Sequence, residues 1–385
     1  MRRLLVLAST MVFFDVAFYA AIAPLLPHYV SKFDLSEAEA GILQASYAAG
    51  TLLLALPSGL LAARIGPRRT VIGGLAVFGA SGLVFGFGDQ IAVLDLARFC
   101  QGCAGALIWS GALAWLIAAY PPDRRGAVIG TALGTAVAGA LLGPLLGGIA
   151  AKIGTGAVFG AVTVIAVVLA IAAARTPELG VSEVQDLRTA LRIIATRPIV
   201  IATAFVAVPS LMAGAIEVLV PLRIDDLDGG STLIAAAFVV GAGIEASLAP
   251  IAGRYSDRVG RRAPYVFGSA VCAAAMVGIA AGQALGVVIG SLLVISFGAG
   301  LSFTPAIAAL SEAGETARLH EGVAAGLSNV AWASGQVVGA IVGGGLASAA
   351  GFATPNLAVA ALLAATAVYA SRVLKGGYPA PVSAE

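Results

Sequence analysis

The chain has 385 residues, of which 59% are hydrophobic and 11% charged, and its mean hydropathy is +0.99. Soluble globular domains carry about 25% charged residues, so this composition excludes a soluble domain and indicates a protein that crosses the membrane many times. The net charge of +2 gives no sign of a nucleic-acid partner, and three cysteines make no disulfide framework.

Twelve apolar segments are long enough to cross a bilayer, which takes about 20 residues per helix. The first follows Met-Arg-Arg and is longer than the core of a signal peptide, so we expect it to remain as a membrane helix whose outer end is bent by Pro24 and Pro27. In chain order the expected helices cover residues 4–30, 38–62, 71–87, 91–120, 126–150, 155–174, 198–222, 232–254, 264–282, 285–310, 323–349 and 352–372.

A polar stretch divides these helices into two sets of six. The expected bundles are residues 1–174 and 198–385, and the linker 175–197 contains an amphipathic piece at 181–194. The loops GLLAARIGPRR (59–69) and GRYSDRVGRR (253–262) share Gly-Arg-Gly-Arg at matching offsets, which indicates two parallel repeats.

The basic residues indicate the orientation of the chain. If both termini are cytoplasmic, nearly all of the 22 Lys and Arg residues lie on the cytoplasmic side. The exceptions are Lys32, Lys152 and Arg223 outside and Arg98 within a helix. This bias follows the positive-inside rule and predicts cytoplasmic termini.

The expected fifth helix, 126–150, is unusually rich in glycine. At about 100° per residue, the glycines at 126, 130 and 134 share one flank and those at 139, 143 and 147 share another, so we expect neighbouring helices to pack closely on both. The motif formed by Gly130, Gly139, Gly143, Pro144, Gly147 and Gly148 resembles the fifth-helix antiporter motif of the major facilitator superfamily. In that family the motif marks proton-coupled drug exporters; the alternative is a generic packing helix.

A second motif carries the same resemblance. The loop residues Gly253, Asp257, Arg258, Gly260, Arg261 and Arg262 resemble the G-x-x-x-D-R-x-G-R-R signature of the superfamily, where this loop latches the two halves in the outward-facing state. We expect Asp257 at a helix N-terminus, where the helix dipole favours a carboxylate. The matching loop of the first half, 59–69, departs from this signature, with Ala63 at the aspartate position and Pro67 at an arginine position. The alternative to a latch is a solvated basic loop that only sets topology.

Few ionisable residues lie within the expected helices, and such residues mark function by default. Asp15, Glu217 and Glu245 are the candidate carboxylates, and Asp95 is expected to pair with Arg98. Arg98, with Gln101 and Gly102 after it, also resembles the R-x-x-Q-G motif of the family. The third, sixth, ninth and twelfth helices carry no charge in their cores, and the resemblance implies that this set faces lipid.

A proton-coupled exporter needs a carboxylate that gains and loses a proton. We assign the proton to Glu245 or Asp15 and a cationic substrate to Glu217, although each could instead be a structural or solvated group. Asn329 is a further polar candidate in the eleventh helix, and Tyr19, Trp109 and Trp332 are the expected aromatic members of the cavity.

The sequence therefore predicts a twelve-helix major facilitator in the plasma membrane that exports lipophilic or cationic compounds against proton entry by alternating access. Its expected partners are a small-molecule substrate, protons and the lipid bilayer, and it is expected to act as a monomer. The alternative is a proton-coupled importer or facilitator of a small metabolite. No H-E-x-x-H, G-x-S-x-G or P-loop motif is present, so we expect neither an enzyme nor a cofactor or metal site.

Overall fold

The computed structural model describes residues 2–178, 187–319 and 321–374. Twelve of the described helical segments are long and apolar enough to cross a membrane, which confirms the predicted all-α membrane fold. After the first segment they are α3 (Glu37–Ile65), α4 (Pro67–Phe87), α5 (Ile91–Ala119), α6 (Pro122–Ile153), α7 (Thr155–Ala174), α9 (Arg197–Asp226), α10 (Gly230–Val259), α11 (Arg262–Ala280), α12 (Leu285–Thr316), α13 (Glu321–Ala350) and α14 (Ala353–Val373).

The first span is broken into three pieces, as its prolines predict. Helix α1 (Arg2–Ala20) ends before the 3-10 turn η1 (Ala23–Leu25), and α2 (Leu26–Phe33) completes the crossing. Pro24 and Pro27 lack the amide hydrogen that an unbroken helix needs, so the chain bends at this point.

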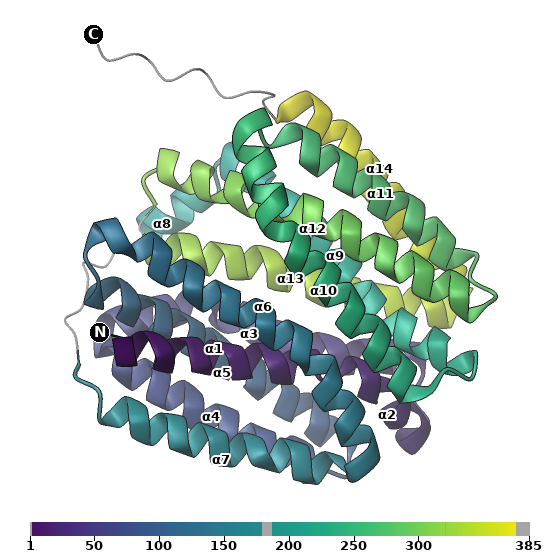
Figure 1. The fold of residues 1–385 in the computed structure, drawn as a ribbon, viewed down its shortest axis with the longest axis horizontal. Coiled ribbons are helices and arrows are strands. Elements are labelled where there is room, and N and C mark those ends of the chain that lie inside the picture. Colours follow the sequence, from purple (N-terminus) through teal and green to yellow (C-terminus); the bar gives the residue numbers. More distant parts are fainter. Residues whose placement is uncertain (1, 179–186, 320, 375–385) are drawn as a thin grey trace.

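The helices form two bundles that lie side by side (Figure 1). In the first, α3 and α4 pack against α5, α1 packs against α6, and α4 packs against α7. In the second, α10 and α11 pack against α12, α9 packs against α13, and α14 packs against α11. The bundles meet through α3 with α13 and through α6 with α10.

Helices α4, α7, α11 and α14 lie on the outside of the bundles. Each exposes large apolar side chains, for example Val164 and Val167 of α7 and Phe267 of α11. These helices are the ones predicted to face lipid, and their surfaces suit a hydrocarbon environment.

The two loops predicted at 59–69 and 253–262 are shorter in the structure than the sequence indicated. Helix α3 continues to Ile65 and α10 continues to Val259, and the chain turns only at Gly66 (φ 93°) and Gly260 (φ 88°). Positive φ is readily adopted only by glycine, so the helix breaks at these two positions. Asp257 therefore lies in the last turn of α10, and the expectation that it begins a helix was wrong.

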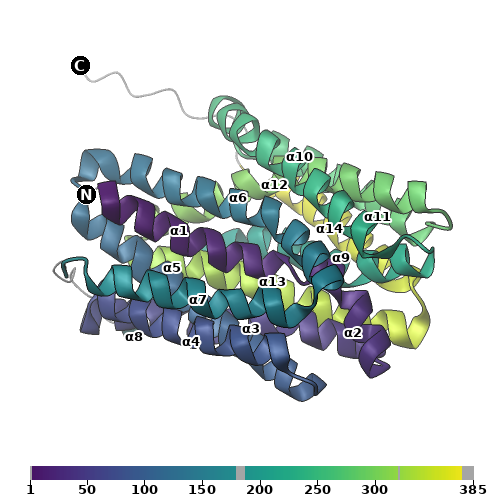
Figure 2. The same ribbon diagram turned by 60° about the horizontal axis from the view of Figure 1, so that its bottom comes forward.

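The start of α1 and the end of α14 lie at the same end of the molecule (Figures 1 and 2). We call this the basic end, because the turns that carry Arg68, Arg258 and Arg262 also lie there, and we call the other the opposite end. Of the predicted amphipathic linker, α8 (Leu187–Ile194) is described at the basic end. Linker residues 179–186, His320 and the tail 375–385 lie outside the described residues.

The two glycine flanks of α6 have different surroundings. A Cβ added at Gly139, Gly143 or Gly147 would meet the backbone of the first span, so this flank packs closely as predicted. Nothing lies within 4 Å of the Cβ position of Gly130 or Gly134. We expected a neighbouring helix on both flanks. This expectation is wrong for the flank that carries Gly130 and Gly134, because α6 and α10 separate there (Figure 2).

Candidate functional site: a cavity between the bundles

A cavity of about 880 Å³ lies between the bundles and is lined by both of them. Its lining reaches Ala63 and Pro67 in the first bundle and Glu315 and Leu319 in the second, all at the basic end, and includes Leu191 of α8. Towards the opposite end the lining stops at the level of Ile22, Ala23 and Glu217. The cavity is therefore open at the basic end and closed at the opposite end.

Contacts between small residues close the opposite end. The Cβ position of Gly148 in α6 lies 3.0 Å from the Cβ of Ala235 in α10, and Gly41 of α3 lies against the backbone of Ala340 and Gly344 in α13. Glycine at these positions lets the two bundles approach closely.

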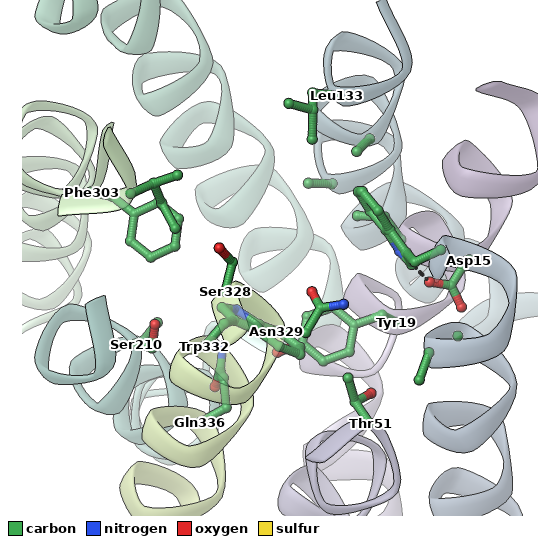
Figure 3. A pocket seen from close by; sticks show the side chains of 18 of the residues that line it. Asp15, Tyr19, Thr51, Leu133, Ser210, Phe303, Ser328, Asn329, Trp332 and Gln336 are labelled. Carbon is green, nitrogen blue, oxygen red and sulfur yellow. Dashed lines mark hydrogen bonds between the residues drawn. The ribbon is translucent and has the colours of Figure 1, made fainter. Parts of the chain in front are cut away.

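Asp15 is fully buried within the first bundle and borders the cavity (Figure 3). The hydroxyl of Tyr47 donates to its two carboxylate oxygens at 2.9 and 3.0 Å, and the indole nitrogen of Trp109 donates to Oδ2 at 3.0 Å. A buried carboxylate needs such donors, because an unpartnered charge in an apolar interior is costly. Both donors come from the same bundle, from α3 and α5.

Arg98 does not pair with Asp95, and the prediction that it does was wrong. The Arg98 guanidinium is fully buried and donates to the Gln101 side chain at 3.0 Å and to the backbone oxygens of Phe18 and Tyr19 at 3.4 and 3.3 Å. One carboxylate oxygen of Asp95 is buried without a hydrogen-bond partner. Arg98 points away from Asp95 because the bundle interior offers it these oxygens and aromatic rings.

Arg98 lies behind the cavity wall rather than in the lining. Its guanidinium is 5.1 Å from the ring centre of Tyr47 and 5.9 Å from that of Tyr19, which are cation–π distances. It also interacts electrostatically with Asp15 and Glu217. One buried positive charge thus serves two carboxylates of the cavity.

Glu217 links the two bundles. It belongs to α9, yet its Oε2 accepts a hydrogen bond from the Tyr19 hydroxyl of α1 at 2.7 Å and from the Gln44 amide of α3 at 2.6 Å. Gln336 of α13 adjoins it. These contacts lie at the closed end of the cavity.

Glu245 has the opposite character. It is half-buried in the middle of α10, borders the cavity, and makes no hydrogen bond or ion pair with any residue that the structure describes. Its charge lies close enough to interact with that of Glu217. A half-buried carboxylate that faces a cavity without a partner has its hydrogen-bonding capacity free for a ligand.

The expected aromatic and amide residues line the cavity. Tyr19, Trp109, Trp332 and Asn329 all border it, and Figure 3 shows Asn329 and Trp332 between Asp15 on one side and Phe303 on the other. The Tyr19 ring lies 5.4 Å from that of Trp332, so aromatic side chains of the two bundles meet there.

Sequence reasoning missed two polar residues of the site, Gln44 and Gln336, and it did not predict the polar contact of Tyr47 with Asp15. All three are buried or border the cavity within apolar helices. The signal that could have found them is the same as for the carboxylates, since an uncharged polar group inside a membrane helix also needs a partner. Their charge does not reveal them, because all three are neutral.

At the basic end, Arg261 ties the signature turn to α12. Its guanidinium donates to Asp257 and to Glu312, both at 2.6 Å. Burial opposes the charge on Arg261, but the contacts with Glu312 and Asp257 outweigh it and raise the pKa of Arg261 above its usual value.

The matching turn of the first bundle makes a different contact. Arg68 forms a 3.0 Å ion pair with Glu178, which follows α7, and the Arg68 amide donates to the same carboxylate at 3.2 Å. The indole of Trp115 donates to the backbone oxygen of Pro177 at 3.3 Å. The start of the linker is therefore fastened to the first bundle.

Two six-helix bundles around a central cavity that opens at one end form the architecture of a membrane transporter. A sequence profile described as Major Facilitator Superfamily matches residues 7–320, and the chain belongs to this family.

Curated relatives match over shorter stretches. The MFS-type transporter ppzB of Metarhizium majus is 30% identical over 125 residues, which are 31% of this chain and 27% of the relative. The quinolone resistance protein NorA of Staphylococcus aureus is 28% identical over 106 residues, 28% of this chain and 27% of NorA. The matched stretches thus span about a quarter of the relatives' lengths.

Solved structures match over nearly the whole chain. A bacterial homologue of the human lysosomal transporter Spinster, in an inward-facing and unoccupied conformation, has a TM-score of 0.76 at 14% identity and covers 96% of both chains. A D-xylose–proton symporter has a TM-score of 0.75 at 16% identity and covers 97% of both. At these identities the likeness concerns the fold.

Proposed function

We propose that this protein is a secondary active transporter that exports lipophilic cations in exchange for protons. The observation that carries the proposal is Glu245, a carboxylate without a partner among the described residues, in a large cavity whose lining is otherwise mainly apolar and aromatic. Such a lining accepts varied apolar bodies, and one free carboxylate selects those that carry a positive charge.

We assign the basic end to the cytoplasm, because the positive-inside rule favours it, and the membrane to the plasma membrane. The cavity then opens to the cytoplasm, as the first step of export requires. Residues 1–174 and 198–385 are the two units that rock against each other, joined by the linker 175–197, and the transporter works as a monomer.

The carboxylates divide the work. Asp15 carries the proton: its burial at the cavity favours the neutral carboxyl, while the donors Tyr47 and Trp109 and the positive charge of Arg98 stabilise the ionised form, so both forms have support. Glu245 receives the cation of the substrate, and Glu217, whose charge interacts with that of Glu245, shares it. This division keeps one of the two sequence-based assignments for the proton and adds Glu245 to the substrate site.

Two further features support export. The quinolone resistance protein NorA is a relative whose name fits a drug exporter. The flank of α6 that carries Gly130 and Gly134 is free of neighbours at the open end, and closing this end against α10 would use it. Asp257 contacts Arg261 of its own bundle while the basic end is open, and its charge would then be available to latch the second bundle to the first when this end closes.

The proposal is tested in everted membrane vesicles with an acidic lumen, because their lumen corresponds to the outside of the cell. We expect them to accumulate a fluorescent lipophilic cation and to lose it when the pH gradient is collapsed. The vesicles could instead accumulate no cation and show gradient-driven movement of a small metabolite in the opposite direction. That result would contradict export and identify an importer.

A further inference from the structure

The contacts of Glu217 differ from those of a vacant substrate site. Its Oε2 already accepts two short hydrogen bonds, from Tyr19 at 2.7 Å and from Gln44 at 2.6 Å. Both donors belong to the first bundle, while Glu217 belongs to the second. A cation that approaches Glu217 therefore competes with these two donors for the same oxygen.

We propose that Tyr19, Gln44 and Glu217 form a cross-bundle clasp that holds the opposite end shut while the cavity is empty, and that a substrate cation opens it by drawing Glu217 away. This inference rests on the proposed function for the identity of the ligand. The clasp itself rests on the geometry of the three side chains.

The position of the clasp fits this role. At 1.5 Å per residue, Gln44 lies about 10 Å below the start of α3, and Glu217 lies about 14 Å below the end of α9. The clasp thus lies at the floor of the closed end, where the cavity lining stops. Opening this end must separate α1 and α3 from α9 and so must break both hydrogen bonds.

The strength of the clasp depends on the charge of Glu217. Hydrogen bonds to an ionised carboxylate are about twice as strong as neutral ones. The charged or titratable groups that face Glu217 are Tyr19 from α1, Arg98 from α5 and Glu245 from α10, while α3 and α13 contribute the uncharged Gln44 and Gln336. A cation between Glu245 and Glu217 would be attracted by both and would weaken the pull of Glu217 on its donors.

The clasp has a consequence for coupling. An exporter must not interconvert freely when it is empty, because that would let the gradient dissipate without moving substrate. A clasp that only substrate releases ties the opening of the opposite end to the loaded state, so Tyr19 and Gln44 are positioning residues for the transport cycle.

The test measures the distance between spin labels at Asp89→Cys and Gln283→Cys, two exposed loop positions of the two bundles at the opposite end. The labels are placed in the full chain, in nanodiscs, after Cys100, Cys103 and Cys272 are replaced by Ala and transport is verified.

Without ligand we expect the short, closed distance, and Tyr19→Phe or Gln44→Leu should each raise the open population about tenfold, as expected for one hydrogen bond to a charged group. Tyr265→Phe is the matched control, because its hydroxyl bonds to Phe205 within one bundle.

A second readout separates a clasp from a merely structural role. Tetraphenylphosphonium should open the wild-type protein and should bind Tyr19→Phe about tenfold more tightly, because the cation no longer competes with the tyrosine. Unchanged label distances in both Tyr19→Phe and Gln44→Leu, or weaker binding of the probe, would overturn the clasp. If both variants are open but tetraphenylphosphonium does not change the label distance of the wild-type protein, the clasp is supported and the lipophilic cation is excluded as its ligand.

Discussion

The two bundles treat their buried carboxylates differently. In the first bundle, Asp15 receives hydrogen bonds from Tyr47 and Trp109 of the same bundle, and Arg98 stands behind them. In the second bundle, Glu245 faces the cavity without a partner among the described residues. The donors of Asp15 hold its carboxylate in one place and stabilise its ionised form, whereas Glu245 keeps its hydrogen-bonding capacity free for a ligand that brings its own donor or charge.

The largest expected effect comes from Asp15→Asn. We expect gradient-driven accumulation of the cation to fall to the level of vesicles without the protein, because the amide cannot carry the proton. Binding of tetraphenylphosphonium should persist, since Glu245 is intact. Transport and equilibrium binding are measured on the same preparation, with the exposed Asp89→Asn as control. Gradient-driven transport that survives in Asp15→Asn would end the assignment of the proton to this residue.

Glu245→Gln should act on binding instead. We expect the Kd for tetraphenylphosphonium to rise about 10- to 100-fold, the size of a lost interaction with a partly buried charge, while the affinity for a neutral analogue stays the same. Glu315→Gln is the matched control, because Glu315 lies exposed at the mouth of the same cavity and should change binding by less than about fivefold. Equal losses for both variants would mean a general surface charge effect rather than a site.

The turns of the two bundles at the basic end should also differ in their importance for transport. We expect Asp257→Asn to slow transport about tenfold without changing membrane insertion, because the proposed latch at the basic end needs the charge of Asp257. Glu178→Gln, which breaks the Arg68 ion pair within the first half, should change the rate by less than about twofold. Initial transport rates at equal protein content give the comparison, and full activity of Asp257→Asn would remove the latch from the account.

The smallest effect on transport is expected from the packed glycine flank, where the change falls on stability. In Gly143→Ala the new methyl would lie 2.5 Å from the Cβ of Ala20, so overpacking should destabilise the protein by about 1–3 kcal/mol. In Gly130→Ala the methyl meets nothing within 4 Å, so the Tm should not fall. Thermal unfolding in detergent measures both, and equal losses would mean that the two flanks have the same surroundings.

The number of spans could be predicted from the sequence, because the length and apolarity of each segment are local properties. The position of Asp15, Glu217 and Glu245 at the cavity could also be predicted, since a charged side chain within a membrane helix faces the interior of the bundle or a water-filled cavity rather than lipid. The broken first span followed equally from local chemistry, through Pro24 and Pro27.

The partners of these side chains could not be predicted in this way. Gln44 and Glu217 are 173 residues apart in the chain, and no local pattern indicates that they meet. Arg98 was expected to pair with its neighbour in sequence, but the bundle interior offered Gln101 and two backbone oxygens. Whether the flank of α6 that carries Gly130 and Gly134 is packed depends on how far the two bundles have separated, which is a property of the conformational state.

The most direct test of the account measures protons rather than substrate. Proteoliposomes with a pH-sensitive dye inside and no imposed gradient receive tetraphenylphosphonium, and the internal pH is followed for the wild-type protein, Asp15→Asn and Glu245→Gln. We predict that entry of the cation drives protons out and makes the lumen of wild-type vesicles alkaline, and that neither variant does so. Movement of the cation without any change of internal pH, or acidification of the lumen, would contradict proton exchange.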